Sequence, residues 1–214
     1  ICDKYGVLLI ADEVLVGLGR TGQWWASDHW QLKPDILVTS KGLAGGYYPL
    51  GFIAAQGDHV ELIRQNLGDF SHGGTFSHHA VGCAAGLATL RILRDENLVQ
   101  NSAEMGRYLG QKLHQAFDTH PHVGDIRGRG LFWALEYVQD KATKEPFPRQ
   151  AHLAWRIWQV AFELGLIVYY SQGCADGVNG DVNMFGPPLI INKDQVDEMV
   201  ALMHTAVTDV LGAA

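Results

Sequence analysis

Three short apolar runs mark the first half of the chain. Residues 7–11 form the first, and Asp12 and Glu13 follow it directly. Residues 35–39 and 50–55 form the second and third, and prolines or glycines border both. Unbroken apolar runs of this length are typical of parallel strands that are buried on both faces. We therefore expect three such strands, followed by helices near 58–67 and 79–95.

The pattern changes after residue 96. Helical spacing and alternation predict helices near 98–118, 150–164 and 193–211, and strands near 123–127, 131–138, 166–170 and 182–185. We place a domain boundary near residue 96, with the end of an α/β layer in 1–96 and a compact α+β domain in 97–214. The chain begins at Ile1 and enters a strand pattern almost at once, so we expect further sequence upstream.

Composition narrows the class of protein. The 214 residues are 47% hydrophobic and 18% charged, which is enough apolar sequence for a sizeable core. The net charge of −7 argues against nucleic acid or an anionic membrane as partner. No apolar run reaches membrane-spanning length, and no signal-peptide pattern opens the chain. The three cysteines are far apart and odd in number, which favours free thiols and a cytoplasmic location.

An acid and an amine follow two of the apolar runs. Asp12 directly follows the first run, and Lys41 comes two residues after the second. Alone, such an aspartate is more often a cap, and such a lysine is more often a solvated charge. At equivalent strand ends they favour a site, because ligands bind at the carboxyl ends of parallel strands. A partly desolvated lysine there is a usable nucleophile.

The residues around this pair resemble a known family. Residues 12–22, DEVLVGLGRTG, match every fixed position of the D-E-V-x-x-G-x-G-R-T-G signature of class III (omega) aminotransferases, a branch of the fold-type I pyridoxal-phosphate enzymes. Residues 34–43 are similar to the family's lysine segment, 72–76 to its G-x-T segment, and 127–131 to its R-G-x-G turn. The segments occur in the family's order and cover its C-terminal half.

The resemblance implies a fold and a cofactor. Residues 1–96 would be the end of a fold-type I large domain, a mostly parallel sheet with helices on both faces, and 97–214 the small α+β domain. Lys41 would carry pyridoxal 5'-phosphate as a Schiff base and then move a proton between substrate and cofactor. Asp12 would hold the ring nitrogen of the cofactor.

Two further residues would contact the cofactor if the resemblance holds. Val14 would press against one face of the ring, although a plain core valine explains it nearly as well. Thr75 would bind the cofactor phosphate of a neighbouring subunit, which implies a homodimer with shared active sites. Thr75 is also interpretable as the N-cap of the helix that follows, and both roles are compatible.

Other polar residues have simpler interpretations. Arg20 lies in a glycine-rich turn, where we expect it to brace the loop. Arg127 and Arg129 lie in a predicted tight turn, and binding of a substrate carboxylate is the less favoured role for either. The histidines at 72, 78 and 79 match no zinc motif, so we expect no metal site.

The substrate prediction depends on departures from the family pattern. Leu15 and the paired Tyr47 and Tyr48 resemble the amine:pyruvate and β-alanine:pyruvate branch. Tyr169 or Tyr170, and Met184, stand where arginines that bind the substrate carboxylate often occur. Without a forked guanidinium at these places, we favour an amine or ω-amino acid donor and a small keto acid such as pyruvate.

Two alternatives stay open. Decarboxylases, racemases and aminomutases of the same family share the cofactor motifs, so these residues do not exclude them. The chain could also be a truncated, non-catalytic fragment that retains only the fold and the dimer surface. Intact Lys41 and Asp12 argue against this second alternative.

Overall fold

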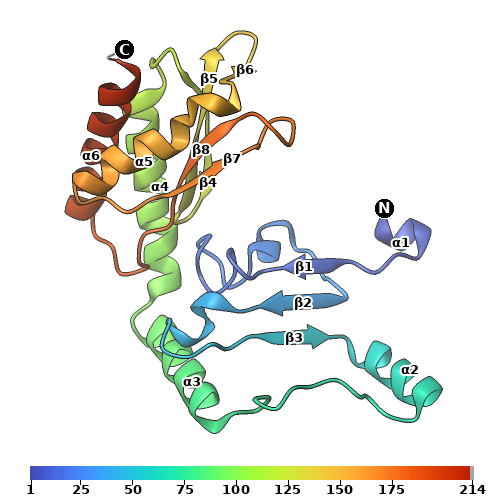
Figure 1. Ribbon diagram of the computed structural model, residues 1–214. Helices are drawn as coiled ribbons and strands as arrows, with labels where there is room; N and C mark the ends of the chain where they lie inside the picture. The colour runs from blue at the N-terminus through green and yellow to red at the C-terminus, as the bar shows by residue number, and fades with distance from the viewer. Residues whose placement is uncertain (213–214) are drawn as a thin grey trace. The chain divides into compact units, whose positions relative to one another are not determined.

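The computed structural model describes residues 1–212. The chain folds into two compact units, Ile1–Val99 and Gln100–Ala214. The first unit contains α1 (Cys2–Tyr5), β1 (Ile10–Asp12), β2 (Ile36–Thr39), β3 (Phe52–Ala55), α2 (Gly57–Leu67), α3 (Ala80–Asp95) and the short 3₁₀ helices η1 (Ala26–Trp30) and η2 (Lys41–Ala44). Its three strands form one sheet in the order β1-β2-β3, and β1 runs parallel to β2 (Figure 1).

The carboxylate of Asp35 sets where the parallel pair begins. Leu9 N donates to Asp35 Oδ2 at 2.7 Å, and Asp35 N donates back to Leu9 O. The amide of Leu9, and the nearby His59 ring, hold the pKa of the Asp35 carboxyl below its ordinary value. The first apolar run therefore enters the sheet only at Ile10, three residues later than its pattern predicts.

The third apolar run does not form the expected parallel strand. β3 is antiparallel to β2, with Phe52 opposite Thr39. A parallel strand needs a long crossover to return the chain to the other end of the sheet. Residues 40–51 contain only the four-residue η2, so β3 begins at the edge where β2 ends.

The strands of the first unit are also less buried than their apolar pattern predicts. Every residue of β3 is exposed, and β1 is exposed at both ends. Burial on both faces requires a helical layer on each side of the sheet. Among the described residues, α2 buries none of its own, so it does not supply such a layer.

The second unit is α+β. Its elements are α4 (Leu98–Phe117), which begins just before the unit boundary, β4 (Val123–Arg129), β5 (Phe132–Asp140), β6 (Glu145–Pro146), η3 (Arg149–Ala151), α5 (Leu153–Glu163), β7 (Tyr169–Gln172), β8 (Asp181–Phe185) and α6 (Lys193–Leu211). The strands pair in the order β4-β5-β8-β7, with β6 added to β5, and every pair is antiparallel.

A closed core lies between this sheet and its helices. On α4 the buried residues recur every four positions, at Met105, Leu109, Leu113 and Phe117, so they form one apolar stripe. Full burial of each such side chain contributes about 2 kcal/mol. At α6 the Asn192 side chain accepts from Gln195 N at 3.0 Å and Gln195 Oε1 accepts from Asn192 N, which is a complete capping box.

Glycines let α4 approach the turn between β4 and β5. A Cβ on Gly106 would lie 2.2 Å from the backbone carbonyl of Gly130, and one on Gly110 would collide with the Trp133 ring. Gly130 itself has a φ of +56°, which suits glycine. The R-G-x-G segment is therefore explained by close packing within the unit.

Candidate active site

The parallel pairing of β1 and β2 brings Asp12 and Lys41 to one edge of the sheet. Asp12 is the last residue of β1 and pairs with Val38 of β2. Lys41 follows Val38 by three residues, just past the end of β2. Because parallel strands end at the same edge, the carboxylate and the amine lie at neighbouring strand ends, as their place in the sequence predicts.

The Asp12 carboxylate is held by the backbone and keeps one oxygen uncommitted. Val14 N donates to Asp12 Oδ1 at 3.0 Å, which fixes the direction of the carboxylate. Within residues 1–212, Oδ2 accepts no hydrogen bond. An exposed carboxylate with one oriented and one open oxygen suits a protonated ring nitrogen.

Lys41 stands in a strained backbone conformation. Its φ is +38°, in the left-handed region that lysine rarely adopts. The segment is held on both sides, because Ser40 Oγ donates to Leu50 O at 3.0 Å and Leu43 N donates to Ser40 O at 2.9 Å. Among the described residues, Lys41 Nζ forms neither an ion pair nor a hydrogen bond. Strain of this kind is concentrated at functional sites.

Glu13 is the residue of this edge that sequence reasoning missed. Its side chain is 2% exposed, and its oxygens accept from Ala26 N and Ser27 N, each at 2.8 Å. Its backbone N donates to Val38 O at 2.8 Å, which extends the pairing of β1 and β2 past Asp12. Strand alternation was the available signal: if Asp12 faces outward, its neighbour faces the interior.

The glycine-rich turn after Glu13 is tightly folded. Gly17 N donates to Glu13 O at 3.0 Å, and a Cβ on Gly17 would lie 2.8 Å from that oxygen. Arg20 is half-buried in this turn, and burial lowers its pKa below the ordinary arginine value. The bracing role expected for Arg20 stays a prediction.

Val14 and Thr75 occupy different surroundings in the first unit. Val14 is half-buried and directly follows the Asp12-Glu13 pair at the sheet edge. Thr75 is exposed in a turn, five residues before α3 begins. It is not the N-cap of that helix, since the cap position is His79. The helix starts later than a Thr75 cap requires, because the chain first makes a turn in which Ser77 N donates to Gly74 O.

The second unit shows where Arg127 and the tyrosines of β7 lie. Arg127 forms ion pairs with Asp125, at 2.6 Å, and with Glu136. These carboxylates raise the pKa of Arg127 despite partial burial, and they leave it a poor receptor for a substrate carboxylate. Tyr169, one of the two tyrosines considered for such an arginine position, lies opposite Met184 on the neighbouring strand, and Tyr170 lies opposite Asn183.

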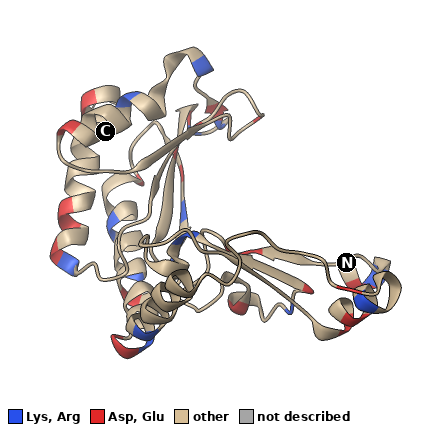
Figure 2. Cartoon of the chain, turned by 60° about the horizontal axis from the view of Figure 1, so that its bottom comes forward, with Lys and Arg blue, Asp and Glu red and all other residues tan. Residues whose placement is uncertain are grey.

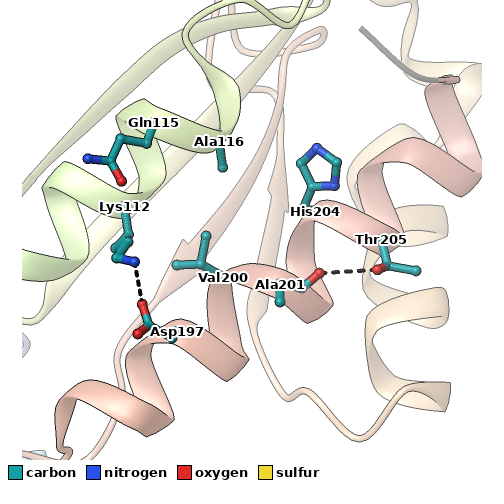
Figure 3. Close-up of a pocket in the computed structure, with 8 residues that line it drawn as sticks. All are labelled: Lys112, Gln115, Ala116, Asp197, Val200, Ala201, His204 and Thr205. Atoms are coloured by element: carbon teal, nitrogen blue, oxygen red, sulfur yellow. Dashed lines mark hydrogen bonds and ion pairs between the residues drawn. The ribbon is translucent and has the colours of Figure 1, made fainter.

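A hollow on the second unit lies between α4 and α6 (Figure 3). Its lysine, Lys112, is already paired with Asp197 at 2.8 Å, and Tyr108 also donates to that carboxylate. The remaining groups that line it include His204 and Thr205, whose hydroxyl donates to Ala201 O at 3.1 Å. Its charges are satisfied internally, so we do not assign the reaction to this hollow.

Metal-binding clusters and membrane-spanning helices are both absent from the described part of the chain. Residues 1–212 contain no cluster of three or more histidine, cysteine or acidic side chains suited to a metal ion. None of the helices in this range is both long and apolar enough to cross a membrane. Figure 2 shows acidic and basic residues interspersed along the chain, without a block of one sign.

Comparison with known proteins identifies the family. The model of the family "Aminotransferase class-III" matches residues 1–207. The diaminobutyrate–2-oxoglutarate transaminase of Halomonas elongata is 42% identical over 98% of this chain and 44% of its own length. The putrescine–pyruvate aminotransferase of Pseudomonas aeruginosa is 39% identical over 93% of this chain and 41% of its own length.

Solved structures agree with this match. A thermostable (S)-enantioselective omega-transaminase from Thermomicrobium roseum superposes with a TM-score of 0.89 at 36% identity, over 98% of this chain and 45% of that chain. The fold is that of the fold-type I transaminases. The chain belongs to the class-III aminotransferase family, whose members depend on pyridoxal phosphate. It spans less than half the length of the relatives described above.

Proposed function

We propose that the protein is a pyridoxal-phosphate-dependent aminotransferase in which Lys41 carries the cofactor and Asp12 holds its ring nitrogen. The observation that supports this most strongly is the parallel pairing of β1 and β2, which ends both strands at one edge. The uncommitted Asp12 Oδ2 and Lys41 Nζ fit the nitrogen and the aldehyde of the cofactor. When bound, the cofactor withdraws electrons from the carbon that bears the substrate amine.

The chain's own residues would then bind, orient and move a proton. Asp12, fixed by Val14 N, holds a positive ring nitrogen through a charge-assisted hydrogen bond. Once the substrate amine has displaced it from the cofactor, Lys41 Nζ would accept the proton from the substrate carbon and pass it to the cofactor carbon. Val14 would limit the tilt of the ring from the same edge. Residues 1–96 would be the end of the large domain, and residues 97–214 would be the small domain.

The assembled form would be a cytoplasmic homodimer. Thr75 lies in an exposed segment, where its hydroxyl is accessible to the cofactor phosphate of a neighbouring subunit. Phe70 and Phe76, on the same segment, are also exposed, and large apolar side chains of this kind are typical of an interface. The three cysteines are free, which fits a reducing compartment.

For the substrate we propose an amine or ω-amino acid donor and a small keto acid such as pyruvate. Tyr169 and Met184, an adjacent pair without a guanidinium, support this choice. Of the two relatives above, one is named for pyruvate and the other for 2-oxoglutarate, so the names alone do not decide.

Product analysis tests the activity. The purified protein is incubated with a diamine or an ω-amino acid, and with pyruvate, 2-oxoglutarate or no keto acid. We expect alanine from pyruvate, and no alanine from Lys41→Ala. Loss of carbon dioxide, inversion or amine migration without a keto acid would point to a decarboxylase, racemase or aminomutase instead. A strong preference for 2-oxoglutarate would overturn the substrate proposal only.

A further inference from the structure

Every polar atom of Glu13 is committed to holding the active-site edge together. Its two carboxylate oxygens take the first amides of η1, from Ala26 and Ser27. Its backbone N donates to Val38 O, and its backbone O accepts from Gly17 N at 3.0 Å and from Thr39 Oγ1 at 3.4 Å. One buried residue therefore joins the end of β1, the end of β2, the glycine-rich turn and η1.

The hydrogen bonds of Glu13 fix the backbone that orients Asp12. The turn closed by Gly17 N and Glu13 O contains Val14, and Val14 N is the donor that orients the Asp12 carboxylate. On the other side, Val38 and Thr39 are the last residues of β2 before the segment that carries Lys41. A shift of Glu13 would therefore displace both Asp12 and Val14, and it would loosen the approach to Lys41.

We propose that Glu13 is a positioning residue for the cofactor, which it never touches. It acts by fixing the turn whose Val14 amide aims Asp12, and by joining that turn to the end of β2. This inference rests on the proposed function, because it assumes that Asp12 and Lys41 hold pyridoxal phosphate. A buried carboxylate with two amide donors needs its charge: the amide of a glutamine would set one N–H against another.

Asp28 provides a matched control at the same 3₁₀ helix. It is exposed, its Oδ2 accepts from Trp25 N at 3.1 Å, and among the described residues it forms no hydrogen bond with β1 or β2. Asp28→Asn weakens the start of η1 as Glu13→Gln does, but it leaves the sheet edge intact. Loss of stability alone therefore does not separate the two variants, whereas cofactor binding does.

Ala26→Pro offers a second route if Glu13→Gln folds poorly. It removes the N–H that Glu13 Oε2 accepts and leaves the glutamate in place. Proline suits the first position of a helix. Trp25, at φ −124° and ψ 143°, already has the extended conformation required before proline.

The experiment measures the Kd for pyridoxal phosphate and the pH dependence of the bound cofactor's absorption, together with the Tm without cofactor. We expect both Glu13→Gln and Asp28→Asn to lower the Tm. Glu13→Gln should raise the Kd about tenfold or more and shift the pH dependence of the absorption, on the scale of a lost hydrogen bond to a charged group. Ala26→Pro should raise the Kd several-fold, and Asp28→Asn should leave it at the wild-type value.

Two other outcomes have distinct meanings. If wild-type protein binds the cofactor on Lys41, but Glu13→Gln and Ala26→Pro bind it with the affinity and spectrum of Asp28→Asn, Glu13 is only a stabilising residue and the inference is wrong. If the wild-type protein itself gives no Lys41 adduct, the proposed function fails first.

Discussion

Lys41 of the first unit differs from Lys112 and Arg127 of the second unit in whether its charge has a partner. In the second unit Lys112 is paired with Asp197 and Arg127 with two carboxylates, beside a closed core. In the first unit Lys41 has no hydrogen bond or ion pair among residues 1–212, Asp12 keeps one open oxygen, and β3 of the same sheet is exposed. Charges that a protein leaves unpaired at a sheet edge are the ones available to a ligand. We therefore propose that the first unit supplies the groups for chemistry, whereas the second unit contains the larger buried core.

The largest expected effect on stability is in the core of the second unit. Leu113 is fully buried on α4, so Leu113→Ala should lower the free energy of unfolding by about 3 kcal/mol, through lost burial and a cavity. Leu62 on α2 is 59% exposed, and Leu62→Ala should change it by less than about 0.5 kcal/mol. Urea unfolding of both variants checks this. Equal losses of unfolding free energy in the two variants would show that Leu113 and Leu62 contribute equally, which contradicts their difference in burial.

The next effect is on activity and is confined to the first unit. Asp12→Asn keeps an acceptor for Val14 N but loses the charge, so kcat/KM should fall on the order of 100-fold with little change in stability. Asp197→Asn should show the reverse: unchanged kcat/KM and a lower Tm. Steady-state kinetics with thermal melts distinguishes them. An equal loss of kcat/KM in Asp197→Asn and Asp12→Asn would contradict the claim that Asp12 acts in the reaction and Asp197 does not.

A smaller effect concerns a hydroxyl inside the second unit. Tyr137 is fully buried, its hydroxyl has no hydrogen-bond partner among the described residues, and burial raises its pKa well above the ordinary tyrosine value. Tyr137→Phe should leave the protein as stable or up to about 1 kcal/mol more stable. Tyr108→Phe, which removes a donor to Asp197, should cost about 1 kcal/mol. A clear loss in Tyr137→Phe would mean that its hydroxyl is satisfied after all.

The smallest expected effect is a dependence of stability on pH. Hydrogen bonds from Lys112, and then Tyr108, hold the pKa of Asp197 below its ordinary value. A carboxyl with a lowered folded pKa contributes stability above its unfolded pKa of about 4, and this contribution is lost as the pH falls through the folded value. The wild-type advantage over Asp197→Asn should therefore shrink below about pH 4. Urea titrations across that range check it; a constant difference between the two curves would contradict it.

The sequence predicted some parts of this structure well, and the reasons are local. α6 has the predicted bounds because Asn192 and Gln195 make a capping box and the apolar residues keep helical spacing to the end. The strand ends near Asp12 and Lys41 were predictable because an acid follows the first apolar run directly and an amine follows the second after one residue. Helical periodicity and capping need only neighbouring residues, so a single sequence contains them.

Other parts depended on contacts that a pattern does not encode. An apolar run has no direction, so nothing in residues 50–55 predicted that β3 is antiparallel. The late start of β1 is set by Asp35, which lies 26 residues along the chain from Leu9. The role of Glu13 depends on Ala26 and Ser27, which lie 13 and 14 residues further along the chain and fold back onto its carboxylate.

Covalent capture of the cofactor tests the central claim most directly. The purified protein is mixed with pyridoxal phosphate and reduced with borohydride, and the pyridoxyl label is mapped by peptide mass. Lys33 lies in the same unit, just before β2, and is also exposed, so Lys33→Ala is the matched control for Lys41→Ala. The account predicts a label concentrated on Lys41, retained in Lys33→Ala and lost in Lys41→Ala. A label spread over several lysines, or one that survives in Lys41→Ala, would contradict it.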